Sequence, residues 1–76
     1  MKNLIKVERA RYNLTQQQLA DILGITRQSI YAIEGRRFVP STLLALRMAK
    51  LFNLKVEDIF KLEESEIGFI ESLQVE

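Results

Sequence analysis

Two amphipathic segments are separated by only two residues, Gly24 and Ile25, and this short connection constrains the fold more than any other feature. Apolar residues recur at three- and four-residue intervals on both sides of it, which predicts helices over about 15–23 and 26–34. Helices joined by so few residues cannot lie antiparallel, so they must cross steeply. Gly24 supplies a positive φ, and Ala20 is small where the helices approach most closely. The side chains expected to point inward are Leu19, Leu23, Ile25, Ile30 and Ile33.

Capping residues indicate where most of the helices begin and end. Thr15 and Gln18 form the S/T-x-x-E/Q pattern of a capping box at the start of the second helix. Thr26 and Ser41 are placed to cap the third and fourth helices. Helices are expected to end at Asn13, Gly24, Gly35 and Asn53.

Five helices account for the chain up to Phe60, so we expect an all-α fold, a five-helix bundle over residues 1–61. The apolar stripe of the first helix is Leu4, Ile5 and Ala10. The fourth helix is apolar around nearly its whole circumference, which predicts that it lies at the centre. Its apolar residues are Leu44, Ala45, Leu46, Met48, Ala49, Leu51 and Phe52. The fifth helix is short, with Glu57 and Asp58 in its first turn.

Residues 62–76 form an acidic extension whose apolar pattern fits two structures. A helical stripe would comprise Ile67, Ile70 and Leu73. A strand face would comprise Phe69, Leu73 and Val75. Because these side chains have no obvious place in a core already filled, two interpretations remain open. The extension forms a dimer interface with the end of the fourth helix, Leu54 and the fifth helix, or it folds back on its own monomer.

Charge is strongly segregated along the chain, although the net charge is only +1. Residues 1–50 hold nine Lys or Arg against three acids, whereas residues 51–76 hold two Lys against seven acids. The halves therefore carry charges of +6 and −5. This asymmetry predicts a basic surface for a polyanion and an acidic tail that stays away from it.

The composition argues against several classes of protein. The chain has 76 residues with no Cys and no His, so it lacks disulfides, thiolate metal sites and the usual general base. It also lacks a phosphate-cradling Gly loop, and we expect no enzyme, no cofactor, no metal and no evident small-molecule ligand. Residues 1–11 alternate charged and apolar residues, unlike a signal peptide or a membrane span, so we expect a cytoplasmic protein without a membrane partner.

Two stretches, "LTQQQLADILGITRQSIYAIEGRR" and "PSTLLALRMAKLFNLKVEDIF", resemble the phage repressor and Cro type of helix-turn-helix regulators. The resemblance covers roughly residues 4–60 and implies a five-helix bundle that binds DNA, usually as a dimer, with its third helix in the major groove. Two departures are visible. Lys55 stands where many members have a Ser or Thr cap, and this chain continues past Phe60 where many end.

The outward face of the third helix carries side chains suited to reading bases. At about 100° per residue, Arg27, Gln28, Tyr31 and Ala32 lie opposite the inward Ile30 and Ile33. Arginine contacts guanine O6 and N7 together, and glutamine does the same with adenine N6 and N7. Ala32 allows close approach and offers its methyl group to a thymine methyl, while Tyr31 reaches a base edge or a phosphate. The alternative is an ordinary solvated polar face.

Phosphate contacts are expected beside this helix. The resemblance places Gln16, at the start of the second helix, against the DNA backbone, where helix amides favour an anion. The other candidates are Ser29, Arg36, Arg37 and the more distant Arg11. Alternatively, Gln16 is a helix-favouring surface residue and Arg37 lies over Phe38. The resemblance also implies a partly buried, structural ion pair between Arg9 and Glu34.

These observations predict a homodimeric transcriptional regulator, a repressor, that binds a roughly palindromic operator in double-stranded DNA. Two copies would read half-sites about one helical turn, ~34 Å, apart. The alternative is a protein-interaction module, such as an antitoxin or anti-repressor, for which Leu43 offers an exposed apolar side chain. Duplex RNA is disfavoured because its deep, narrow major groove does not admit a helix.

Overall fold

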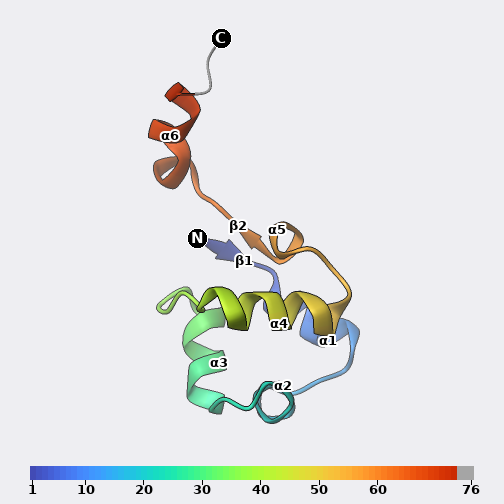
Figure 1. Ribbon diagram of the computed structural model, residues 1–76. Coiled ribbons are helices and arrows are strands. Elements are labelled where there is room, and N and C mark those ends of the chain that lie inside the picture. Colours follow the sequence, from blue (N-terminus) through green and yellow to red (C-terminus); the bar gives the residue numbers. More distant parts are fainter. Residues whose placement is uncertain (74–76) are drawn as a thin grey trace.

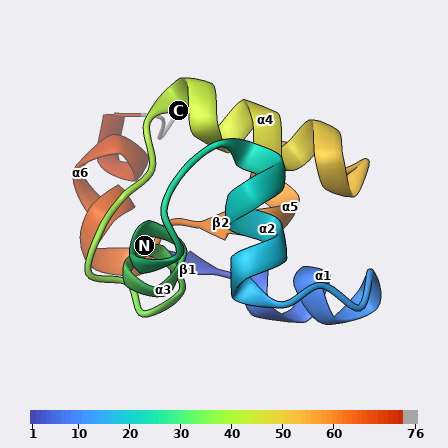
Figure 2. The ribbon, with the colours of Figure 1, turned by 90° about the horizontal axis from the view of Figure 1, so that it is seen from below.

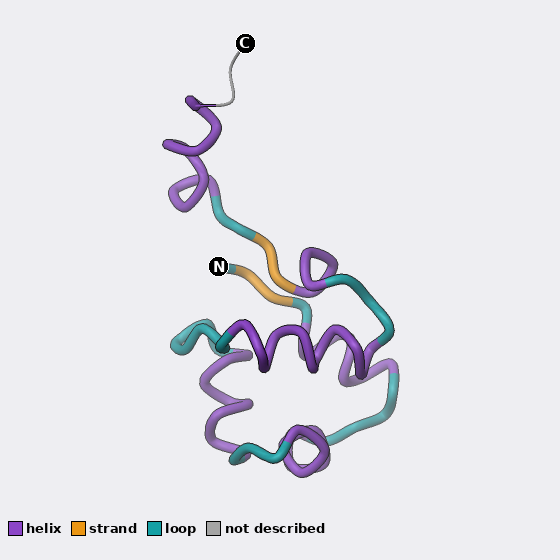
Figure 3. Tube along the Cα trace, in the orientation of Figure 1, coloured by secondary structure: helices purple, strands orange, loops and turns teal. Residues whose placement is uncertain are grey.

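The computed structural model describes residues 1–73, which form a mostly helical bundle with a small two-stranded sheet (Figures 1 and 3). In chain order the elements are β1 (Lys2–Asn3), α1 (Ile5–Arg11), α2 (Gln16–Leu23), α3 (Arg27–Glu34), α4 (Thr42–Phe52), α5 (Val56–Ile59), β2 (Phe60–Lys61) and α6 (Glu64–Leu73). The helical prediction is therefore confirmed for α1 to α5. The strands were not predicted, and residues 1–73 hold six helices instead of five.

Side-chain caps begin three of the helices as the sequence predicts. In α2 the Gln18 amide donates to Thr15 Oγ1 at 3.0 Å, and the Thr15 amide donates to Gln18 Oε1 at 2.9 Å. Thr26 caps α3 and Ser41 caps α4. At α5, where Lys55 makes no side-chain cap, its backbone amide donates to the Asp58 carboxylate at 3.1 Å. That bond supplies half of a capping box.

The helices end where the sequence predicts, but after α3 the left-handed residue is not the glycine. Asn13, Gly24 and Asn53 adopt positive φ values of 57°, 71° and 57°. Gly35, however, has a φ of −80°, and the left-handed residue is Arg36, with a φ of 63°. The helix keeps its turn through Gly35, where a Cβ atom would lie only 3.2 Å from the Tyr31 carbonyl oxygen. The predicted end of α3 at Gly35 is therefore confirmed, and only the left-handed conformation falls one residue later, at Arg36.

The strained position of Arg36 leads to a testable stability prediction. A non-glycine residue in the left-handed region costs about 1 to 2 kcal/mol, whereas glycine adopts it without steric cost but loses more backbone entropy on folding. Arg36→Gly should therefore raise the free energy of unfolding by about 0.5 to 1 kcal/mol. The matched control is Arg37→Gly, because Arg37 does not have a positive φ and should lose stability. Urea melts that show Arg36→Gly to be destabilised would contradict the prediction.

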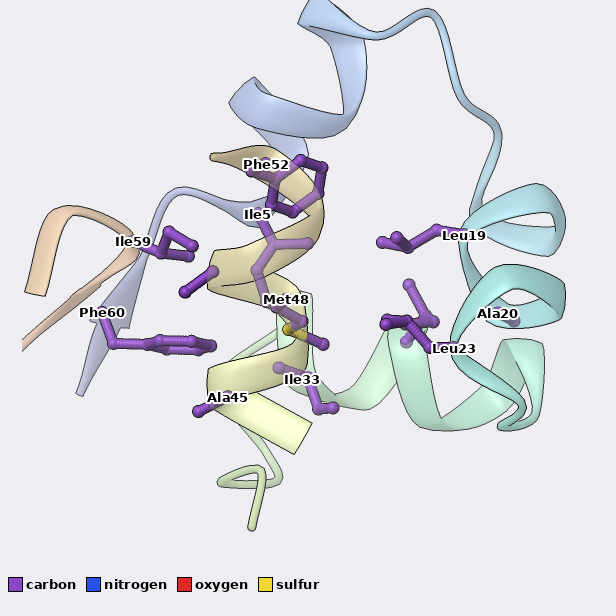
Figure 4. Close-up of a cluster of buried hydrophobic side chains, with 12 residues drawn as sticks. Ile5, Leu19, Ala20, Leu23, Ile33, Ala45, Met48, Phe52, Ile59 and Phe60 are labelled. Atoms are coloured by element: carbon purple, nitrogen blue, oxygen red, sulfur yellow. The ribbon is translucent and has the colours of Figure 1, made fainter. Parts of the chain in front are cut away.

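One hydrophobic core joins all five helices of the bundle (Figure 4). Its centre is Met48 of α4, which is completely buried. Four of the five side chains predicted to point inward are buried, and the fifth, Ile25, packs partly against the cluster. The full set of buried apolar residues is Ile5, Leu19, Ala20, Leu23, Ile30, Ile33, Ala45, Met48, Ala49, Phe52, Ile59 and Phe60.

The stripe predicted for α1 is wrong at two of its three positions, whereas α4 lies in the core as predicted but keeps one exposed side. Ala10 is exposed because it lies about 140° around α1 from the buried Ile5, and Leu4 precedes the helix and is 40% exposed. Leu46 of α4 is 54% exposed, so the central helix is not covered on all sides.

The sheet ties the chain's beginning to the end of the bundle. β1 and β2 pair antiparallel, with Lys2 opposite Lys61 and Asn3 opposite Phe60. The Asn3 side-chain amide also donates to the Ile33 carbonyl oxygen at 2.8 Å, near the end of α3. β1 therefore lies between the last strand and α3. Two-residue strands carry no apolar alternation, which is why the sequence did not predict them.

The extension forms the helix α6 over Glu64–Leu73, and Val75 lies outside the described residues. At the start of α6 the Glu63 amide donates to Glu66 Oε1 at 2.7 Å, and the amino terminus of Met1 donates to Glu66 Oε2 at 3.0 Å. These two contacts, in that order, lower the pKa of the Glu66 carboxyl below its ordinary value. From this attachment α6 runs away from the bundle (Figure 1). No helix within residues 1–73 is long and apolar enough to cross a bilayer.

Candidate nucleic-acid interface

α2 and α3 form the steep pair that the short connection predicts (Figure 2). Gly24 turns the chain with its positive φ, and the Ile25 amide donates back to the Ala20 carbonyl oxygen at 3.0 Å. Ala20 itself is completely buried, as expected for a small residue beneath the crossing. The core side chains of both helices fix the angle, so α3 presents its opposite side to solvent.

The outward face of α3 agrees with the wheel prediction. Arg27, Gln28 and Tyr31 are exposed, and Ala32 is half-buried at the edge of the same face. Thr26 caps this helix through the Ser29 amide at 3.1 Å, which places Arg27 and Gln28 in its first turn. The structure therefore brings the four predicted base-reading residues together on one surface.

A hollow of about 260 Å³ lies next to this face and contains an aromatic residue that sequence reasoning did not assign to the site. Its lining residues are Thr26, Gln28, Ser29, Ala32 and Phe38. Phe38 is 53% exposed and comes from the loop after α3. The signal that could have indicated it is an aromatic residue directly after two arginines, because aromatic and basic side chains together are typical of nucleic-acid surfaces.

The second hollow, of about 500 Å³, lies at the start of α2. Its lining residues are Arg9, Thr15, Gln16, Gln17 and Arg27. Arg27 and the amino end of α2 make this hollow electropositive, which is the environment a phosphate group requires, while the charge of Arg9 is balanced by Glu34. The Gln16 side chain lies here, and its amide donates to Glu34 Oε1 at 3.2 Å. Arg27 therefore borders both the predicted base-reading face and this candidate phosphate site.

The predicted ion pair between Arg9 and Glu34 is confirmed. Arg9 Nε lies 2.8 Å from Glu34 Oε2, and Arg9 Nη2 lies 3.2 Å from Oε1, in a two-pronged arrangement. The side chains are only 15% and 7% exposed. Arg9 also donates to the Leu14 carbonyl oxygen at 2.8 Å. The pair therefore holds α1, the loop before α2 and the end of α3 in fixed relation.

The remaining predicted phosphate contacts have different surroundings. Ser29 shares a hydrogen bond with Thr26 at 2.9 Å at the start of α3. The Arg37 guanidinium lies 5.9 Å from the centre of the Tyr31 ring, so it does not stack over Phe38 as the alternative supposed. Arg36 Nη1 is 3.5 Å from Glu63 Oε1.

Arg11 is the predicted phosphate residue that the fold does not bring to the site. It belongs to α1, at the opposite end of the bundle from α3 (Figure 1). Its side chain is 71% exposed and lies 3.5 Å from Glu8. A phosphate contact from Arg11 would therefore need DNA that extends past α2.

This crossed helix pair, with a polar outward face on its second member, is the arrangement that comparison with known proteins identifies. Residues 5–59 match the family model described as Helix-turn-helix. The chain belongs to the Cro/C1-type helix-turn-helix family. This confirms the resemblance seen in the sequence. The match ends before β2, so α6 lies outside the region that helix-turn-helix proteins share.

Several relatives carry names of helix-turn-helix regulators. "Uncharacterized HTH-type transcriptional regulator YgzD" of Bacillus subtilis is 50% identical over 64 residues, which cover 84% of this chain and 97% of the relative. "Uncharacterized HTH-type transcriptional regulator MJ0272" of Methanocaldococcus jannaschii is 52% identical over 66 residues, covering 87% and 100%. "ImmF control region 10 kDa protein" of Bacillus phage phi105 is 38% identical over 68 residues, covering 90% and 72%. The family is one of DNA-binding transcriptional regulators and not a class of enzymes.

Proposed function

We propose that this helix-turn-helix protein is a repressor that binds a roughly palindromic DNA operator as a homodimer, with α3 in the major groove. The observation that carries the proposal is the outward face of α3, where Arg27, Gln28 and Tyr31 are exposed together. Arginine and glutamine in the first turn of such a helix have the donor pattern that reads guanine and adenine. The base-reading residues are thus Arg27, Gln28, Tyr31 and Ala32.

The electropositive hollow at the start of α2 supports the orientation of the DNA. Gln16 and the first amides of α2 would meet one phosphate, while Ser29 and Arg37 flank α3. Arg36, at the end of α3, would reach the backbone beyond it. The Arg37 guanidinium lies over the Tyr31 ring, which would keep its positive charge near the DNA major groove. Phe38, beside Ala32, adds an apolar surface that suits a thymine methyl group.

A dimer follows from the size of one domain. One helix in a groove contacts too few base pairs to define a single genomic site, whereas two copies related by a dyad read two half-sites. The name of the phage relative refers to a control region, which supports a regulatory role for this chain. Repression is the role proposed.

Selection from random duplex DNA tests this function directly. The expected result is a symmetric motif whose half-sites lie about one helical turn, ~34 Å, apart. Recovery of an unsymmetrical motif would contradict the dimer. Recovery of no motif at low salt would favour the alternative, an antitoxin or anti-repressor that acts through protein contacts.

A further inference from the structure

The bundle carries an apolar groove that no part of the described chain fills. It has a volume of about 420 Å³ and is lined almost entirely by apolar atoms. Val39 and Pro40 come from the loop before α4, Leu46 from α4 itself, and Val56 and Phe60 from the end of the bundle. Val39 is 64% exposed and Leu46 is 54% exposed. Exposed apolar side chains gathered in one groove are typical of an interaction surface.

The helix α6, called the arm below, carries the complementary feature. Ile70 and Leu73 are 49% and 70% exposed, and with the half-buried Ile67 they share one face of the helix. In Figures 1 and 3 the arm runs away from the bundle instead of lying across it. An amphipathic helix in this position leaves its apolar stripe in water.

The arm's attachment keeps this stripe away from the groove of its own chain. Only Leu62 and Glu63 connect the arm to β2. The amino terminus of Met1 holds Glu66 at 3.0 Å, and Arg36 lies 3.5 Å from Glu63. These contacts fix the first turn beside the groove, and Leu73 lies a further seven residues along, roughly 10 Å of helix. The direction of the arm therefore carries its apolar residues outward.

The charge of the arm indicates which kind of surface it can bind. Residues 62–76 contain five acids and no Lys or Arg. Among the described residues, no side chain that lines the groove is charged. Two acidic arms would repel each other if they paired side by side, so an uncharged apolar groove suits the arm's stripe better than a second arm does.

We propose that the arm of each protomer occupies the apolar groove of a second copy, so that two reciprocal exchanges build the homodimer. Both partners then use the same two surfaces, which closes a two-fold assembly. The exchange places the start of α4 and Val56 of α5 in the interface, whereas Leu54 at the end of α4 packs partly against its own core. The inference rests on the proposed dimer and defines its contacts.

The test uses two double variants of the full chain and a mixing experiment. Ile70→Glu with Leu73→Glu charges the arm, and Val39→Glu with Leu46→Glu charges the groove. All four positions are exposed, so both variants should keep the wild-type circular dichroism spectrum and melting curve. Val7→Glu is the matched control, because Val7 is 50% exposed on α1, away from the arm and the groove.

Sedimentation velocity over a concentration series should show a wild-type dimer and an unchanged control. Each double variant should raise the dimer dissociation constant roughly 100-fold, since each removes two buried apolar side chains at both contacts. An equimolar mixture of the variants should dimerise more tightly than either alone, because the mixed pair keeps one intact arm in one intact groove. Tighter dimerisation of the mixture is expected only if the arm of one chain binds the groove of the other.

Three results would overturn the exchange. They are a monomeric wild type, a groove variant that dimerises as well as the wild type, and the absence of any gain on mixing. Selection from random DNA separates this proposal from the DNA-binding function. A monomer that still selects a motif refutes the exchange and the homodimer but leaves DNA binding standing, whereas a dimer that selects none refutes only DNA binding.

Discussion

Arg9→Ala and Glu34→Ala should each lower the free energy of unfolding by about 3 kcal/mol, because each leaves the other charge buried without its partner. The two-pronged contact at 2.8 and 3.2 Å is shielded from water, with side chains 15% and 7% exposed. A domain of this size has a total stability of roughly 4 to 11 kcal/mol. Either substitution therefore removes a large part of it, and urea melts monitored by circular dichroism measure the loss.

The double substitution should cost less than the two single losses together, because no orphaned charge remains when both partners are absent. Arg11→Ala provides a control on the same helix. Arg11 is 71% exposed and lies 3.5 Å from Glu8, so its removal should cost below about 1 kcal/mol. Simple additivity of Arg9→Ala and Glu34→Ala would show that the two residues stabilise the bundle independently.

Local chemistry explains how much of the fold the sequence predicts. A helix cap is a hydrogen bond between a side-chain oxygen and a backbone amide only three residues away. Helices therefore begin where expected, at the caps Thr15, Thr26 and Ser41. The inward faces of α2 and α3 follow from helical periodicity for the same reason. These features depend on neighbours in the chain, which a single sequence displays directly.

Features that depend on distant neighbours were missed. The strands β1 and β2 are too short to show alternation and form because Lys2 and Lys61 are brought together by the bundle. Leu46 has the character of a core residue, yet nothing in the described chain covers it. The left-handed residue after α3 is Arg36 even though Gly35 precedes it, since Gly35 keeps a negative φ of −80°. None of these outcomes is encoded in local spacing.

In the candidate site, too, the features set by one helix could be predicted from the sequence, and the features set by contacts between distant segments could not. The shared face of Arg27, Gln28 and Tyr31 follows from the geometry of one helix and is confirmed. The place of Phe38 beside Ala32 depends on the path of a loop, and periodicity says nothing about loops. The hydrogen bond from Gln16 to Glu34 joins two helices, so it too could be found only in the folded chain. Which of these residues touch DNA stays a prediction.

Arg27→Ala should weaken binding to the selected operator far more than binding to random duplex DNA. A bidentate contact to a base is worth about 1 to 3 kcal/mol, and a dimer loses one in each half-site. The expected loss on the operator is therefore roughly 30-fold or more, with little change on random DNA. Gln28→Ala should behave in the same way. Fluorescence anisotropy titrations on both duplexes give the two affinities.

Arg36→Ala should instead weaken both duplexes alike, because a phosphate contact carries no sequence information. The slope of log affinity against log salt should fall by about one per lost contact, hence about two for a dimer. Lys55→Ala is the control for lost charge, since Lys55 is exposed in the loop before α5 at the far end of α4. If Arg36→Ala and Lys55→Ala gave the same slope of log affinity against log salt, Arg36 would not contact a phosphate. A loss confined to the operator for Arg36→Ala, with equal losses on both duplexes for Arg27→Ala, would mean that α3 is not the reading helix.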